Sequence, residues 1–256
     1  GATPAFPYAF DAIAEPDWFD AVLYSDIEQD LTRYFGSTKI SVTNELFVIA
    51  GFNAIDFERS GNNAGTTIDN EESEASPYVG ATYAVTENIN TYVSYSDVYQ
   101  PQEQYDLSGQ FLAPTKGKNF EAGVKAQWLD DELLTTFAYF TADQENLAAF
   151  AGINPENQQY YYEGVTVESE GFEVEVVGQI TDALRVQVSY TAIDVEDEAG
   201  NDANLWAPRD VVTFQLGYEL PAVPALTVGL GGRWQSEISN TDYNVEQGSY
   251  FLANAY

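Results

Sequence analysis

The sequence predicts an all-β chain, in which about eleven antiparallel strands run up and down as part of a transmembrane β-barrel. Three observations support this fold class. Strand-like segments alternate apolar and polar residues. They come in pairs joined by short turns, whereas longer segments connect one pair to the next. Aromatic residues stand near the ends of the apolar faces.

The clearest alternation lies in residues 117–128. Phe120, Val124 and Trp128 fall on one face, and Glu121 and Lys125 fall on the other. Successive side chains of a strand point to opposite sides of a sheet, so this segment has one apolar and one polar face. We expect the apolar face to contact lipid and the polar face to line the lumen. A polar turn at 130–132 then reverses the chain into residues 133–143.

The other strands follow the same plan along the chain. They are expected at residues 29–42, 46–57, 78–85, 89–99, 165–180, 184–194, 211–220, 226–235 and 248–256, with short turns at 43–45, 86–88, 181–183 and 221–224. Longer, mostly polar connections occupy 59–76, 100–115, 144–164 and 195–209, and residues 1–26 read as an irregular entry. Strict alternation of short and long connections is typical of a membrane barrel, with short periplasmic turns and long external loops. A soluble sandwich with Greek-key crossings gives no such rule.

Aromatic residues near strand ends predict girdles at the two membrane interfaces, where amphipathic rings are enriched. The residues are Tyr83, Tyr95, Trp128, Tyr139, Tyr190, Tyr218 and Trp234. Carboxylates avoid the apolar faces and gather in connections or on polar faces, so strong acidity does not contradict a membrane location.

Composition excludes several classes of function. The formal net charge is −32 and the chain has neither cysteine nor histidine. An acidic surface is unsuited to nucleic acid, and disulfides, thiolate metal sites and a Ser-His-Asp triad cannot be built. We therefore expect no enzyme, no catalytic residue and no resident metal. Two acidic groups are better explained by structure than by chemistry. We interpret the 194–202 segment as a solvated loop rather than a calcium site. We interpret Glu173 and Glu175 as lining a wet lumen rather than as a glycosidase pair.

Several motifs resemble, in the right order, the TonB-dependent siderophore receptors of the Gram-negative outer membrane. They are YVSYSDVYQPQ (92–102), GKNFEAGVK (117–125), EGFEVEVVGQITDALRVQVSYT (170–191), APRD (207–210) and GLGGRWQS (229–236), with EPDW (15–18) near the start. The resemblance implies a barrel of about 22 strands filled by an N-terminal plug. Residues 1–256 would be the later part of that barrel, with the plug and the last strands outside this chain. The acidity departs from the family's usual composition.

The resemblance also implies a function: uptake of a ferric siderophore, energised by TonB through an N-terminal segment outside this chain. The siderophore would be transported cargo, with no covalently bound cofactor. Outer-membrane lipid and lipopolysaccharide would surround the barrel in the cell outer membrane, and nucleic acid is not an expected partner. Three alternatives stay open: a passive porin- or adhesion-type barrel, a secreted soluble β protein, and TonB-dependent uptake of another cargo such as a vitamin or a glycan.

Ligand contacts are expected from aromatic and polar groups on the long connections and the upper lumen, because sites combine concavity with a few placed polar groups. The candidates are Tyr99, Gln100, Gln102, Tyr105, Phe111, Tyr160, Tyr161, Tyr162 and Trp206. Loop packing is the alternative interpretation for each of them.

Overall fold

The structure is a computed structural model that describes residues 25–63, 66–223, 225–241 and 243–256. These residues form strands, turns and loops. The strands are β1 (Ser25–Ser41), β2 (Leu46–Asn63), β3 (Thr66–Ala84), β4 (Ile89–Gln100), β5 (Thr115–Trp128), β6 (Leu133–Ile153), β7 (Tyr160–Thr181), β8 (Leu184–Asp197), β9 (Asp210–Glu219), β10 (Thr227–Gln235), β11 (Ile238–Asn240), β12 (Val245–Gln247) and β13 (Tyr250–Ala255). No helix of this described part is long and apolar enough to cross a membrane.

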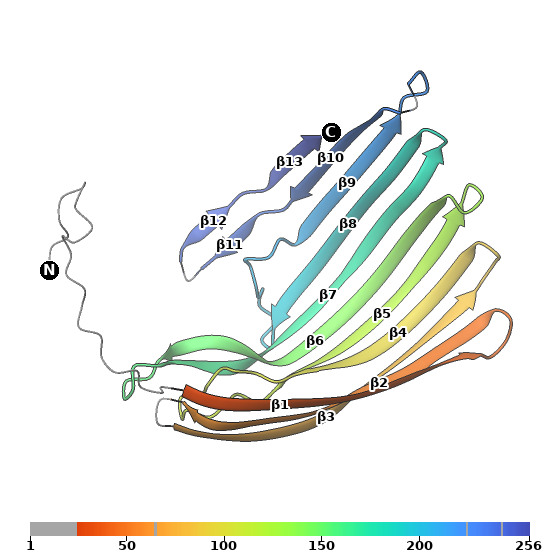
Figure 1. Cartoon of the computed structure of the whole chain (residues 1–256). Coiled ribbons are helices and arrows are strands. Elements are labelled where there is room, and N and C mark those ends of the chain that lie inside the picture. The colour runs from red at the N-terminus through yellow and green to blue at the C-terminus, as the bar shows by residue number, and fades with distance from the viewer. Residues whose placement is uncertain (1–24, 64–65, 224, 242) are drawn as a thin grey trace, which may run out of the picture. The chain divides into compact units, whose positions relative to one another are not determined.

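Eleven strands form one sheet in chain order, from β1 through β10 to β13, while β11 and β12 make a separate two-stranded hairpin. From β3 to β10 each strand pairs antiparallel with the next, and β10 pairs antiparallel with β13, so the predicted up-and-down all-β fold is confirmed. Figure 1 shows β4 to β10 side by side, with the short turns together at one end. In the described chain β1 and β13 are the edges of this sheet, so it is an open portion of a barrel.

Three of the short turns share one local design. A threonine follows an aliphatic residue, and its hydroxyl oxygen accepts hydrogen bonds from the next strand's first N–H groups. Thr43 Oγ1 lies 3.0 Å from the N of Leu46, Thr86 Oγ1 lies 3.0 Å from that of Ile89, and Thr181 Oγ1 lies 3.1 Å from that of Leu184. A side-chain oxygen thus occupies backbone donors that the reversal leaves unpaired, which is why threonine suits this position.

The sheet has an apolar face that is open to its surroundings. Phe120, Val124 and Phe137 are 43 %, 37 % and 48 % exposed, and among the described residues no large side chain is completely buried. Such a face is unusual in water but ordinary in lipid, where apolar side chains gain nothing by withdrawing. At its loop end, the hydroxyls of Tyr139 and Tyr190 donate to carboxylates of Glu170 and Asp210 at 2.7 and 2.6 Å. Each tyrosine ring lies on the apolar face, and its hydroxyl points to a carboxylate at the loop end of that face. This arrangement fits the predicted girdle.

The opposite face is polar and low in relief. Tyr92 lies over Gly123, where an added Cβ would stand 2.6 Å from the ring. Its hydroxyl donates to Glu121, and the Nζ of Lys125 lies 5.1 Å from the ring centroid. Thr191 Oγ1 donates to Glu173 at 3.3 Å on the same face. The expected separation of Phe120 from Glu121 and Lys125 therefore holds.

Two of the predicted long connections are wrong. Residues 59–76 are mostly strand, because β2 runs to Asn63 and β3 begins at Thr66, and residues 144–164 are largely the far ends of β6 and β7. Backbone pairing continues there although the apolar alternation stops. Side chains outside the alternating pattern support these parts: Arg59 and Ile68 are 3 % and 5 % exposed, and the ring of Phe150 contacts those of Tyr160 and Tyr162. Between β10 and β13, residues 238–240 and 245–247 pair as the small β11–β12 hairpin.

The chain divides into two compact units: residues 1–30 with 58–71, and residues 31–57 with 72–256. In the smaller unit the described residues are strand ends, and Arg59 is only 3 % exposed there. When the side-chain amide of Gln29 is oriented with its oxygen toward Arg59, that oxygen accepts hydrogen bonds from Arg59 Nε at 2.9 Å and Nη2 at 3.2 Å. The predicted entry segment, with its EPDW motif, and Pro224 of the fifth short turn lie outside the described residues.

Candidate functional site

The connection between β4 and β5, residues 101–114, folds into a small hairpin of its own. The N–H of Leu112 donates to Gln104 O at 2.9 Å, and Tyr105 pairs with Phe111 across the hairpin. Their rings stack with centroids 4.5 Å apart and planes inclined by 28°. The two predicted aromatic contacts of this loop are therefore neighbours that offer a joint ring surface.

Asp106 organises the tip of this hairpin. Its Oδ1 accepts hydrogen bonds from Ser108 N at 2.8 Å, Ser108 Oγ at 2.6 Å and Gln110 N at 3.0 Å. Partial burial of Asp106 would raise the pKa of its carboxyl, but these donors and the N–H of Gly109 outweigh that effect and lower the pKa below its ordinary value. Gly109 has φ +81°, a conformation that costs glycine little. The tip is thus a turn held by one ionised side chain.

A second aromatic group lies on the far ends of β6 and β7. Phe150 meets Tyr160 and Tyr162 edge to face, with centroids 5.6 and 6.1 Å apart. The ring of Tyr161 lies against Gly152, on the other side of the ladder. Register shifts at Gln144/Leu147 and Phe150/Gly152 bend this hairpin away from regular pairing. Tyr160 is 63 % exposed, so it is available to a ligand.

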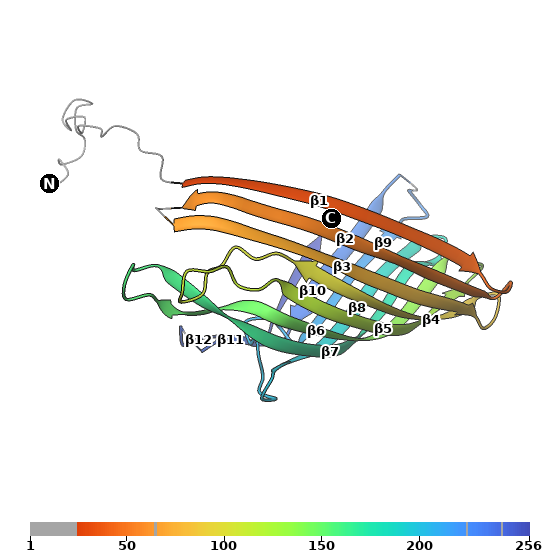
Figure 2. The same cartoon turned by 90° about the horizontal axis from the view of Figure 1, so that it is seen from below.

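Hydrogen bonds join the two aromatic groups. The N–H of Tyr162 donates to Tyr105 O at 2.8 Å, and Asn154 Nδ2 donates to Leu107 O at 3.0 Å. Figures 1 and 2 both show the far end of the β6–β7 hairpin beside the loop that joins β4 to β5. We call the group of Tyr105, Phe111, Phe150, Tyr160 and Tyr162 the aromatic platform. It contains four of the nine predicted ligand residues and adds Phe150, which the sequence reasoning missed. A fifth, Tyr161, lies on the opposite side of the β6–β7 ladder, against Gly152.

The other four predicted residues lie differently. Gln102 is 7 % exposed, and its amide serves neighbouring backbone carbonyls rather than an open surface. Tyr99 is the penultimate residue of β4 and donates from its hydroxyl to Glu72 at 2.6 Å; the last residue, Gln100, is exposed. Trp206 is 62 % exposed on the β8–β9 connection.

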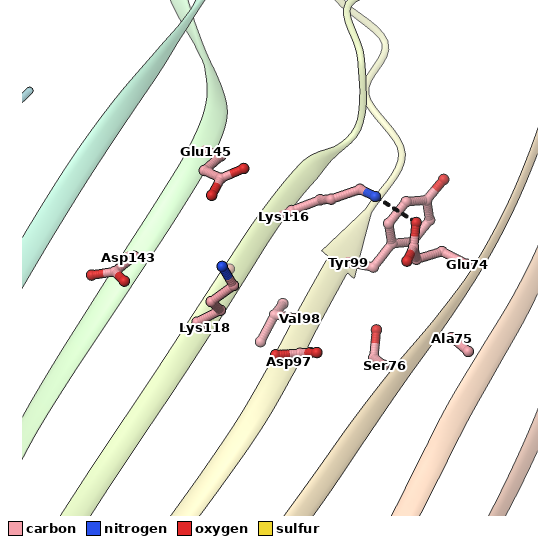
Figure 3. Close-up of a pocket in the computed structure, with 11 residues that line it drawn as sticks. Glu74, Ala75, Ser76, Asp97, Val98, Tyr99, Lys116, Lys118, Asp143 and Glu145 are labelled. Carbon is pink, nitrogen blue, oxygen red and sulfur yellow. Dashed lines mark hydrogen bonds and ion pairs between the residues drawn. The ribbon is translucent and has the colours of Figure 1, made fainter.

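A charged pocket of about 230 Å³ is lined by residues of β3, β4, β5 and β6. Lys116 Nζ is paired with Glu74 Oε2 at 2.5 Å, and Figure 3 shows this pair beside Tyr99. Lys118 stands between Asp97 and Asp143, its cross-strand partners on β4 and β6. By alternation the two lysines share the sheet face of Phe120, so the pocket lies on that face, beyond Phe120 toward the start of β5. The sequence reasoning missed this cluster, although the even spacing of Lys116, Lys118 and Phe120 was a usable signal.

Metal ligands are not concentrated anywhere in the described chain: no group of three or more Asp or Glu residues there has a geometry that could hold an ion. The acidic 194–202 segment instead builds a turn, in which Asp197 Oδ1 accepts from Ala199 N and Asn201 N, both at 2.9 Å. These hydrogen bonds lower the pKa of the Asp197 carboxyl, the largest contribution coming from Asn201. The site is thus a set of aromatic and amide surfaces with carboxylates tied into turns.

Comparison with known families gives one match that spans nearly the whole chain. Residues 3–256 match the family described as TonB dependent receptor-like, beta-barrel. The ferripyoverdine receptor of Pseudomonas aeruginosa is 34 % identical over 243 residues, which cover 91 % of this chain and 29 % of that protein. The ferrioxamine B receptor of Salmonella typhimurium is 26 % identical over 257 residues, covering 95 % of this chain and 36 % of that protein. The chain thus spans about a third of the length of these relatives.

Solved structures give the same picture. The crystal structure of the outer-membrane ferripyoverdine receptor of Pseudomonas aeruginosa bound to ferripyoverdine superposes with a TM-score of 0.80 at 30 % identity, covering 95 % of this chain and 34 % of that one. The alcaligin outer-membrane receptor of Bordetella pertussis gives a TM-score of 0.70 at 27 % identity, covering 91 % and 45 %.

Proposed function

The chain belongs to the TonB-dependent receptor β-barrel family, and on that premise we propose that the whole protein takes up a ferric siderophore across the outer membrane. The family consists of receptors and transporters of the Gram-negative outer membrane rather than enzymes. In this proposal TonB energises transport, and the siderophore is cargo rather than cofactor. These residues then supply one part of the barrel, and a plug is contributed by another part of the protein.

One observation carries the proposal: the similar proteins are named as receptors or transporters of ferric siderophores. They include receptors for ferripyoverdine and ferrioxamine B and a ferrichrome transporter of Escherichia coli. These cargoes differ in chemistry, so the match supports the class of cargo and leaves its identity to experiment. A net charge of −32 disfavours the approach of strongly anionic complexes, which favours neutral or cationic ones.

We place ligand recognition on the aromatic platform. Its rings offer flat apolar contact, and neighbouring hydroxyls supply hydrogen bonds, the combination that binding sites commonly use. Tyr105, Phe111, Tyr160 and Tyr162 are the proposed contacts there, and Tyr161 is a further one on the opposite side of the ladder. Tyr99, Gln100 and Trp206 are placed where a large ligand or a second site could reach them, and Gln102 supports the loop from beneath.

The proposal extends to the surrounding lipid. The apolar face of Phe120 and Val124 would contact hydrocarbon, and the charged pocket beyond it would lie at the level of the headgroups and of lipopolysaccharide. Lys116 and Lys118 are the cations there that suit phosphate. The carboxylates beside them moderate that attraction.

Direct binding tests the cargo. The full-length protein in detergent is titrated with ferripyoverdine, ferrioxamine B and ferrichrome, and with their iron-free forms, while quenching of intrinsic fluorescence is followed. We expect saturable binding of at least one ferric complex. Replacing Tyr105 or Phe111 by alanine should weaken it by about tenfold, because truncating a central aromatic contact commonly costs more than 1 kcal/mol. Leu226→Ala, on the short-turn side, is the control.

Two results would redirect the proposal. If no ferric complex binds and production of the protein ignores iron starvation, while a vitamin or a glycan does bind, the cargo is of another class. If reconstituted protein conducts ions steadily without an energy source, a passive porin-type barrel is favoured.

A further inference from the structure

Two buried amide side chains lie between the 101–114 loop and the β6–β7 hairpin. Gln102 is 7 % exposed and Asn154 is 9 % exposed. Buried amides are costly unless their donors and acceptors are used, so the partners of these two groups indicate what they are for.

Gln102 ties the loop to β6. Its Nε2 donates to Ala113 O at 2.5 Å and to Asn146 O at 2.6 Å. The first bond closes the two stems of the loop on each other, and the second reaches across to a residue with φ +59° inside the register shift of β6. In the other direction, Asn146 Nδ2 donates to Pro114 O of the loop at 3.4 Å. A regular strand would use that carbonyl in its ladder, so the bulge provides the acceptor.

Asn154 ties the tip of the loop to the tip of the hairpin. Its Nδ2 donates to Leu107 O at 3.0 Å, while its Oδ1 accepts from Glu156 N at 2.9 Å. Its own N–H donates to Gln159 O at 2.7 Å, which fixes the asparagine within the β6–β7 turn. One side chain thus holds its own turn and the neighbouring loop.

We propose that Gln102 and Asn154 are positioning residues that clamp the 101–114 loop onto the β6–β7 hairpin and so form the aromatic platform before a ligand arrives. The proposal rests on the proposed function only for the nature of the ligand. Without the clamp, Tyr105 and Phe111 sit on a connection of about fourteen residues that must be ordered at each binding event. The apparent affinity then falls by the fraction of molecules in which the loop is in place.

Isosteric changes separate the clamp from packing. Gln102→Glu keeps the size of the side chain but replaces its donors by an acceptor that faces two carbonyl oxygens. Asn154→Asp removes the donor to Leu107 and keeps the acceptor for Glu156. Asn157→Asp is the matched control, because this exposed asparagine of the same turn also keeps its acceptor for Gln159 N and gives up only a 3.3 Å bond to Gln159 Oε1.

Hydrogen exchange of the full-length protein without ligand tests the clamp. In wild type we expect residues 104–112 to be protected, and both clamp variants to exchange there at least tenfold faster, since each loses hydrogen bonds of buried groups. Asn157→Asp should match wild type. The comparison requires that all variants form the barrel equally well. Resistance to unfolding by SDS in gels run without heating measures this.

Binding then tests positioning, with ferripyoverdine as the probe. The clamp variants should bind it about tenfold more weakly than wild type and Asn157→Asp. A wild-type loop that exchanges like unprotected peptide, or clamp variants that exchange like wild type, would overturn the proposal. So would faster exchange with unchanged affinity, because the loop would then be held without serving binding. Protected wild type that binds no ferric siderophore contradicts the proposed function instead and leaves the clamp supported.

Discussion

Asp106 shows how one ionised side chain can shape the tip of a loop. Burial alone would raise the pKa of this carboxyl, but donors from Ser108, Gln110 and Gly109 lower it below 3.8. A depressed pKa in the folded state stabilises the turn above the ordinary pKa and loses that effect as pH falls through the folded value. The tip of the loop should therefore keep its shape at neutral pH and loosen only in strong acid.

Carboxyl-carbon NMR of the full-length protein in detergent checks this. We expect Asp106 to titrate below 3.8, and Ser108→Ala to move its midpoint upward because the hydroxyl donor is lost. Gln110→Ala should leave the midpoint in place, since only the backbone N–H of Gln110 is bonded to the carboxylate. A wild-type midpoint at or above 3.8 would contradict the assignment.

At the same scale, the residues of the site were partly predictable. Aromatic composition in long connections was enough to select Tyr105, Phe111 and 160–162. The role of Gln102 was not, because its acceptor is a carbonyl that a β-bulge frees on a distant strand. Phe150 was missed for a related reason: residues 144–153 read as a polar loop, although they continue a strand.

Among elements, the membrane-sized part of each strand was predictable and the extension beyond it was not. The alternation of Phe120 to Trp128 reports two different environments, apolar and polar, and the pattern exists only where the environments differ. Beyond that part β6 and β7 continue without the alternation, and the contacts of Phe150 with Tyr160 and Tyr162 support their pairing. The aliphatic–threonine turns were recognisable because the hydroxyl acts locally, within three residues.

Strand β5 depends on Gly123 for close approach. An added Cβ would stand 2.6 Å from the ring of Tyr92 and 2.6 Å from Phe137 O, and the second contact is with backbone. Gly123→Ala should lower the free energy of unfolding by about 1–3 kcal/mol, the usual cost of overpacking. Gly217→Ala is the control, because its Cβ would meet nothing closer than 3.9 Å. Denaturant titration in lipid vesicles measures both, and equal losses would refute a special role for Gly123.

In the whole molecule, charged and apolar side chains are separated between the two faces of the sheet and along the length of the strands. Net charge is −32, yet two carboxylates of the apolar face, Glu170 and Asp210, lie at its loop end, where they accept from the hydroxyls of Tyr139 and Tyr190. The polar face holds Glu121, Lys125 and Glu173 along its middle. The order from apolar band to ring to carboxylate matches the order from hydrocarbon to interface to water.

This arrangement predicts strongly unequal costs for a new charge on the two faces. Val124→Arg places a cation midway between Phe120 and Trp128 on the apolar face and should lower the free energy of unfolding in vesicles by about 2–4 kcal/mol. Ser94→Arg places the same side chain on the polar face beside its cross-strand partner Glu121 and should cost far less. In detergent micelles, where water reaches the surface more easily, the gap should narrow. If Val124→Arg and Ser94→Arg are equally harmless in vesicles, the face of Phe120 does not contact lipid, and the barrel places this part of the sheet against protein instead.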